Sequence, residues 1–87
     1  MMNKEIIYLI TSYLNTQKSY LDEKVRVLDE GKYTCITCNY QGLDLEICVY
    51  NETFIKVKVD RLPYAICDGI KSFRSEFDRL PLLRYQW

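Results

Sequence analysis

A stretch of alternating apolar and polar residues constrains this chain more than any other part of it. One alternating run covers residues 43–50 and a second covers residues 54–60, with only residues 51–53 between them. Alternation with a period of two is typical of a β-strand with one buried and one exposed face. The stretch therefore predicts two adjacent strands. It also indicates which side chains share each face, because a shift of one residue in register exchanges the two faces.

The length and composition favour one folded domain over residues 1–87, with an apolar tail at residues 81–87. Hydrophobic residues make up 48% of the chain, which favours a folded globule over a disordered chain. Lys plus Arg and Asp plus Glu both number 12. This neutral balance lacks the basic field expected of a non-specific nucleic-acid binder.

Amphipathic segments on both sides of the strands predict two helices. The apolar stripe of the first, over residues 4–18, consists of Ile6, Leu9, Ile10, Tyr13 and Leu14. The stripe of the second consists of Ile66, Ile70, Phe73, Phe77 and Leu80. Because proline suits the first turn of a helix, residues 61–63 are predicted to begin the second helix. Pro81 is predicted to end it, with Gly69 inside it.

Two further strands are predicted at residues 24–28 and 33–40. The short connections imply antiparallel neighbours, because parallel neighbours need long crossovers. Both helices have to bury their apolar stripes, and one face of the sheet accommodates both. The predicted fold is α+β, a two-layer sandwich. A four-stranded antiparallel meander sheet has the N-terminal and C-terminal helices packed on one face (α-β-β-β-β-α).

Loop lengths that place apolar residues opposite one another set the register of the last two hairpins. A two-residue loop at residues 41–42 pairs Ile36 with Ile47, and a three-residue loop at residues 51–53 pairs Ile47 with Val57. The latter also sets Glu46 opposite Lys58, which is a favourable cross-strand pair.

The first hairpin is assigned a two-residue loop at Glu30 and Gly31, which pairs Val27 with Thr34. With these three loops, one row of the face away from the helices consists of Leu28, Tyr33, Tyr50 and Phe54. The next row consists of Arg26, Cys35, Cys48 and Lys56, and the row after it of Lys24, Thr37, Glu46 and Lys58.

Aromatic side chains beside arginine are typical of protein–protein interfaces. The predicted anchors of a partner protein are therefore Leu28, Tyr33, Tyr50 and Phe54, with Arg26, Lys56 and Lys58 as orienting charges. Tyr85 and Trp87 in the apolar tail are predicted as further contacts. The row also suits stacking of single-stranded bases, and packing of the tail or of a second copy of the chain is a third interpretation.

The cysteines lie at positions 35, 38, 48 and 67. Cys35 and Cys38 form a C-x-x-C, but three positions along a strand send their thiols to opposite faces, so no metal site is predicted there. Cys35 and Cys48 face each other at a non-hydrogen-bonded position, where Cα atoms lie about 4.5 Å apart. We predict neighbouring thiols that are reduced in the cytoplasm and that an oxidant links.

Neither an enzyme nor a membrane protein is predicted. The chain has no histidine, phosphate-binding glycine-rich loop or nucleophile elbow, so we expect no catalytic residues and no cofactor. Nothing is long enough to span a membrane. Residues 5–10 lack the features of a secretory signal, because Glu5 precedes the apolar run and no small-residue cleavage site follows it. A cytoplasmic location is therefore expected.

In its size and its abundance of Ile, Lys, Asn and Tyr, the chain resembles small accessory proteins of phages and other mobile elements. These include inhibitors of host defence such as anti-CRISPR proteins. The resemblance covers size and composition and assigns no residue. With the aromatic face, it favours a small steric inhibitor or adaptor that masks a surface of a larger host protein or complex. The alternative is a module that binds single-stranded nucleic acid.

Overall fold

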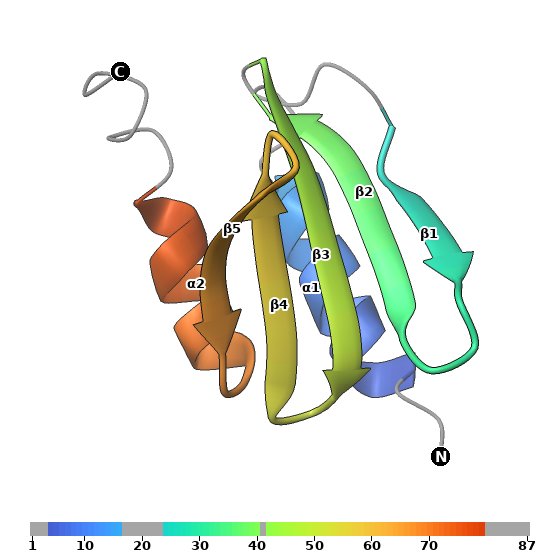
Figure 1. Cartoon of the computed structure of the whole chain (residues 1–87). Helices are drawn as coiled ribbons and strands as arrows, with labels where there is room; N and C mark the ends of the chain where they lie inside the picture. Colours follow the sequence, from blue (N-terminus) through green and yellow to red (C-terminus); the bar gives the residue numbers. More distant parts are fainter. Residues whose placement is uncertain (1–3, 17–23, 41, 80–87) are drawn as a thin grey trace.

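The computed structural model describes residues 4–16, 24–40 and 42–79. It contains a helix, a five-stranded antiparallel sheet and a second helix, and therefore belongs to the α+β class (Figure 1). The elements are α1 (Lys4–Thr16), β1 (Arg26–Asp29), β2 (Thr34–Tyr40), β3 (Leu43–Asn51), β4 (Phe54–Val59), β5 (Leu62–Cys67) and α2 (Ile70–Asp78). The strands follow one another across the sheet in chain order. Neither described helix has the length and apolar content needed to cross a membrane.

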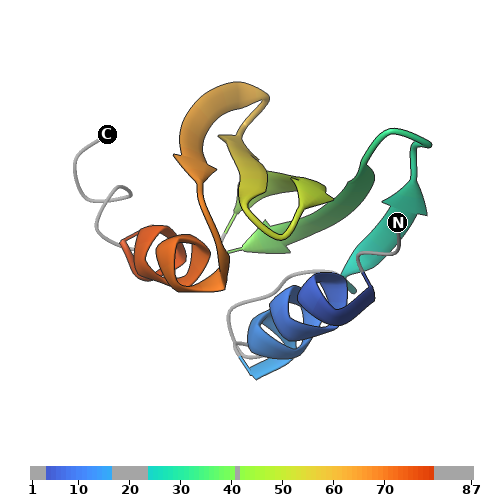
Figure 2. The same cartoon turned by 90° about the horizontal axis from the view of Figure 1, so that it is seen from below.

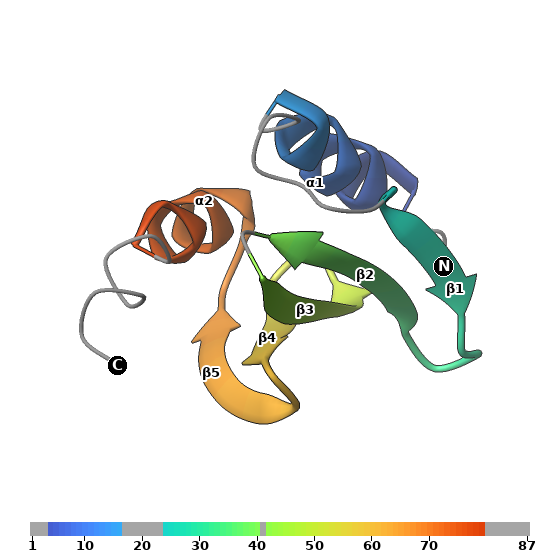
Figure 3. The ribbon, with the colours of Figure 1, turned by 90° about the horizontal axis from the view of Figure 1, so that it is seen from above.

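Both helices lie on the same face of a strongly curved sheet, as views along the two ends of the strands show (Figures 2 and 3). Their buried side chains, among them Ile10 and Leu14 of α1 and Phe73 and Phe77 of α2, share one core cluster. The sheet contributes every second residue of its central strands to this cluster, including Ile47. This confirms the predicted two-layer arrangement, since the period-two and helical patterns both bury their apolar positions in one core.

The first helix follows its predicted stripe with one exception. Ile6, Ile10 and Leu14 are buried, as the spacing of four residues requires. Leu9, which was predicted to widen the stripe, is 40% exposed, while Ile7 on the other side packs against the core. The prediction for Leu9 was therefore wrong, because the stripe widens on the side of Ile7 and not on the side of Leu9.

The predicted start of the second helix was also wrong. Residues 62–67 form the fifth strand, β5, and α2 begins only at Ile70, after Gly69. Ile66, which was assigned to the core face of the helix, is 69% exposed on this strand. Leu80 and Pro81 lie outside the described residues, as do the predicted last two residues of the first helix.

The hairpin between β4 and β5 explains this error. Its two loop residues, Asp60 and Arg61, have φ angles of 52° and 69°. Positive φ at both positions is the mark of a type I′ turn, which usually contains Asn-Gly or Asp-Gly rather than Asp-Arg. Pro63 then follows in an edge strand, where a missing N–H is tolerated, beside a bulge at Val57 and Lys58. Pro63 therefore lies in the edge strand β5 and not in the first turn of a helix.

Replacing Arg61 with glycine is expected to stabilise the fold by up to about 1 kcal/mol. A non-glycine residue with positive φ carries a penalty of about 1–2 kcal/mol, which is partly offset by the larger unfolded-state entropy of glycine. Urea denaturation of both proteins measures the difference. If residues 61–63 began a helix, the same change would lower the free energy of unfolding, since glycine is a poor helix former.

The register of the central hairpins confirms the predicted pairing. Ile36 lies opposite Ile47, Ile47 opposite Val57, and Glu46 opposite Lys58. The predicted three-residue loop was wrong, because Asn51 pairs with Phe54 and only residues 52–53 form the loop. A bulge between Val49 and Asn51 takes up the extra residue and keeps the rest of the register as predicted. The alternating pattern therefore predicted correctly which side chains of β2, β3 and β4 face the helices.

The first hairpin differs from its prediction by two residues. Val27 pairs with Ile36 and not with Thr34, so the loop has four residues, 30–33, and not two. The Gly31 N–H donates to Asp29 Oδ1, and Gly31 has a φ of 88°, which holds the longer loop closed. A shift of two residues leaves every side chain of β1 on its predicted face but moves it one row along the sheet.

Candidate functional site

Three aromatic rings form a continuous row on the outer face, the face of the sheet away from both helices. This aromatic row consists of Tyr33, Tyr50 and Phe54. The ring centroids of Tyr33 and Tyr50 lie 5.0 Å apart, as do those of Tyr50 and Phe54, with interplanar angles of 31° and 30°. Because the rings pack side by side, each of these residues is half-buried. The sequence thus predicted the row correctly for these three residues.

Leu28 and Arg26 lie on the outer face but one row away from their predicted positions. Leu28 is opposite Cys35 and is 50% exposed, and Arg26 is opposite Thr37. The error follows from the four-residue loop of the first hairpin. Leu28 therefore adjoins the aromatic row instead of completing it.

The two lysines predicted as orienting charges have different partners. Lys56 Nζ lies 5.4 Å from the ring centroid of Tyr50 and 5.6 Å from that of Phe54, within the range of a cation–π interaction. Lys58 Nζ lies 3.8 Å from Glu46 Oε2 across the strand pair. Of these two lysines, Lys56 is therefore the one whose charge lies against the aromatic row, and the charge of Lys58 is matched by Glu46.

The fifth strand adds apolar residues to the outer face that the sequence analysis missed. Ile66 is paired with Lys56 and is 69% exposed, and Pro63 is paired with Lys58 and is also exposed. Leu62 is 61% exposed, but it is paired with the core residue Val59 and so lies on the helix side of the sheet. A groove of about 480 Å³ runs between β4 and β5 and is lined by Lys56, Val57, Lys58, Pro63, Tyr64, Ala65 and Ile66. The sequence contains one indication of this strand. Asp60 is a residue that favours turns, and it stands at the end of an alternating run, where a hairpin turn into a further strand can follow.

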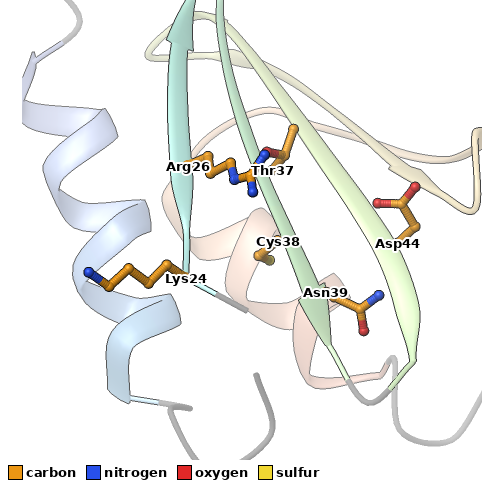
Figure 4. Close-up of a pocket in the computed structure, with 6 residues that line it drawn as sticks. All are labelled: Lys24, Arg26, Thr37, Cys38, Asn39 and Asp44. Carbon is orange, nitrogen blue, oxygen red and sulfur yellow. The ribbon is translucent and has the colours of Figure 1, made fainter. Parts of the chain in front are cut away.

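A second hollow lies at the opposite end of the outer face and is polar. It has a volume of about 360 Å³ and is lined by Lys24, Arg26, Thr37, Cys38, Asn39 and Asp44. Figure 4 shows Arg26 extending toward Thr37, while Lys24 points away from the other labelled residues. Asn39 Oδ1 accepts a hydrogen bond from the Gly42 N–H, so this side chain closes the neighbouring turn. Both signs of charge are present, and the hollow does not select one sign of ligand.

Asp44 and Asp60, which face each other near one end of the sheet, have structural partners. The Asp44 N–H donates to Asp60 Oδ1 at 2.9 Å, and the Asp60 N–H donates to the Asp44 carbonyl at 2.8 Å. These bonds close the end of the β4–β5 turn against β3. The pair therefore has a role in holding the turn, and its geometry is not that of two carboxyl groups aimed at one ligand.

Two cysteines and a glutamate meet in the middle of the outer face. Cys35 lies directly opposite Cys48 across β2 and β3, as predicted, and both thiols are free. Cys48 Sγ lies 3.6 Å from Glu46 Oε2, and the ligand atoms of all three residues lie within 4.8 Å of one another. Cys38 belongs to the core cluster on the other face, which confirms that the C-x-x-C does not converge.

Both thiols of this trio are protonated at neutral pH. Burial, followed by the nearby Cys48 and Glu46, raises the pKa of Cys35 to about 12. Burial and the Glu46 carboxylate also raise the pKa of Cys48. Because the thiolate is the nucleophile, these thiols are poor nucleophiles as they stand.

Mild oxidation at alkaline pH is expected to link Cys35 to Cys48. Facing Cα atoms on adjacent strands are close enough for a disulfide, and the oxidant accepts the two electrons released as the S–S bond forms. Peptide mapping after oxidation identifies the linked residues. A crosslink from Cys35 to Cys38 or Cys67 in the folded monomer would reject the register of β2 and β3.

The predicted contacts of the C-terminal tail, Tyr85 and Trp87, lie outside the described residues. The candidate site therefore rests on the outer face alone. Comparison of the chain with family models, with curated proteins and with solved structures finds no match.

Proposed function

We propose that this chain is a non-enzymatic protein-binding module whose outer face docks on a larger cytoplasmic protein and masks part of its surface. The observation that carries this proposal is the aromatic row, with rings spaced 5.0 Å apart on a sheet face that neither described helix covers. Masking a surface needs no catalytic group, only a buried contact area. The small inhibitors of host defence that the chain resembles in size and composition act within the same class of function.

The apolar surface extends beyond the aromatic row on both sides. Leu28 adjoins it on the β1 side and Ile66 on the β5 side, with exposed fractions of 50% and 69%. Exposed apolar side chains that are contiguous on one face are typical of interaction sites, whereas single ones are common everywhere. The central, half-buried rings supply rigid area that loses little conformational entropy on binding.

Charge favours a partner with carboxylates around an apolar recess. Lys56 stands over the aromatic row, while the positive charge of Lys58 is already matched by Glu46. A partner carboxylate that approaches the rings meets the Lys56 ammonium at the rim of the contact, where charge guides orientation more than affinity. The net charge of zero keeps long-range electrostatic attraction small.

Single-stranded nucleic acid is the second candidate ligand. The same rings and Lys56 offer a stacking surface beside a cation, which is the arrangement that single-strand binders use. Glu46 and Asp44 on the same face weaken this candidate through repulsion of phosphates. Affinity that falls steeply with salt distinguishes nucleic acid from a protein partner.

Capture from a nuclease-treated cell lysate tests the proposal. The baits are the wild-type chain, Phe54→Ala in the aromatic row, and Tyr8→Ala as the matched control, because Tyr8 is an aromatic residue of α1 that is 69% exposed. We expect one protein to bind the wild type and the Tyr8 variant but not the Phe54 variant. That protein, once purified, should form a complex of defined stoichiometry whose affinity depends little on salt.

Two results would contradict the proposal. One is recovery of every captured protein by folded Phe54→Ala at the wild-type yield. The other is a free chain that light scattering shows to be a dimer and in which Phe54→Ala produces monomers, since a second copy would then occupy the outer face. A parallel capture from untreated lysate provides the comparison, and binding that is seen only there would favour the nucleic-acid alternative.

A further inference from the structure

We propose that Cys35, Cys48 and Glu46 form a binding site for Zn²⁺ on the outer face of the sheet. The three side chains lie on neighbouring positions of β2 and β3, two of them on the same strand and one directly across. No part of this site involves the aromatic row, so it stands independently of the proposed partner. The C-x-x-C does not form this site, because Cys38 belongs to the core cluster on the other face. The alternation in β3 puts residues 46 and 48 together on the outer face.

The distances fit a tetrahedral ion with little movement. With Zn–S of about 2.3 Å and Zn–O of about 2.0 Å, tetrahedral ligands lie about 3.5 Å apart for S···O and about 3.8 Å apart for S···S. Cys48 Sγ and Glu46 Oε2 are already 3.6 Å apart, and the ligand atom of Cys35 lies within 4.8 Å of both. The central pair of strands is held by its neighbours on both sides, so the ligands are carried on a rigid support.

The donor set selects the metal. Two thiolates and one carboxylate match the ligands of zinc, whereas Ca²⁺ and Mg²⁺ take oxygen ligands. Three protein ligands leave the fourth position to a water molecule. Cys35 and Cys48 are buried, but the side chain of Glu46 is 37% exposed, which provides the path by which an ion enters.

The charges of the site are balanced once the ion is bound. Two thiolates, a carboxylate and Zn²⁺ leave one negative charge, and Lys58 Nζ lies 3.8 Å from Glu46 Oε2. The Lys58 ammonium therefore neutralises the site and orients the carboxylate, as groups around metal ligands commonly do. Binding releases two protons to solvent, one from each thiol.

Titration of the reduced full-length chain with Co²⁺ tests the site, because cobalt bound to thiolates absorbs in the near ultraviolet. We expect the band to saturate at one equivalent and to disappear when Zn²⁺ is added. Cys35→Ser and Cys48→Ser should abolish it, and Glu46→Gln should weaken binding by at least about 10-fold. The matched controls are Cys38→Ala and Cys67→Ala, whose thiols belong to the core cluster, and these should retain the band.

A second measurement uses only the wild-type chain, so its result does not depend on whether the variants fold. In weak buffer near neutral pH, addition of one equivalent of Zn²⁺ should release two protons. No thiolate band, loss of the band in the Cys67 control with retention in Cys35→Ser, or release of fewer than two protons would each overturn the proposal. Zinc that protects Cys35 and Cys48 from the oxidative crosslink would give independent support, since bound thiolates are unavailable to the oxidant.

Discussion

Replacing Phe73 with alanine is expected to lower the free energy of unfolding by about 3–5 kcal/mol. Phe73 is 1% exposed and its ring packs against two others, with centroids 6.2 Å from Tyr13 of α1 and 5.9 Å from Phe77. Its removal leaves a cavity where α1, α2 and the sheet meet, which neighbouring groups fill only in part. Domains of this size have unfolding free energies near the low end of about 5–15 kcal/mol, so the variant should be largely unfolded at 37 °C (~310 K).

Urea denaturation followed by circular dichroism measures this loss. The matched control is Ile66→Ala, which removes a large apolar side chain that is 69% exposed and should change the free energy of unfolding by less than about 0.5 kcal/mol. If Ile66→Ala were as damaging as Phe73→Ala, residue 66 would lie in the core as a helical residue. The assignment of residues 62–67 to β5 would then be wrong.

Replacing Tyr50 with alanine is expected to weaken binding of the partner protein by about 30-fold or more, a loss of about 2 kcal/mol. Tyr50 is the middle ring of the aromatic row and contacts Tyr33, Phe54 and Lys56. Its removal separates the other two rings and deprives Lys56 of a partner. Titration calorimetry with the partner identified by capture gives the dissociation constant.

Lys56→Ala supplies the comparison for Tyr50→Ala. A charge at the rim should change the association rate and its salt dependence more than the affinity. Tyr8→Ala, far from the outer face on α1, should bind as the wild type does. An unchanged dissociation constant for folded Tyr50→Ala would show that the aromatic row is not the contact surface.

The sequence predicted the central strands well because burial and alternation agree there. One face of β2, β3 and β4 packs against both helices, so only one register buries Ile36, Ile47 and Val57 together. The aromatic row followed from the same register. Loop length in the first hairpin was not determined by this pattern, because loops of two and four residues place β1 on the same face and differ only by one row.

The fifth strand could not be predicted from periodicity alone. Ile66, Ile70, Phe73 and Phe77 follow one another at intervals of four and three residues, which suits a single helix. Only the last three belong to α2, whereas Ile66 lies on β5. The turn before β5, at Asp60 and Arg61, contains no glycine that would have marked it as a hairpin. The exposed apolar residues of β5 were missed for this reason, and with them the groove that extends the outer face.

Nuclear Overhauser effects between aromatic rings test whether the aromatic row lies on the outer face of the sheet. We expect cross-peaks from Tyr50 to both Tyr33 and Phe54, whose centroids lie 5.0 Å from its own, and a close contact between the Hα protons of Cys35 and Cys48. A soluble paramagnetic probe should broaden these ring signals more than that of Phe73. Cross-peaks from Tyr50 to Ile10 or Phe73 would place Tyr50 beneath the helices, and the outer face would then carry no aromatic row.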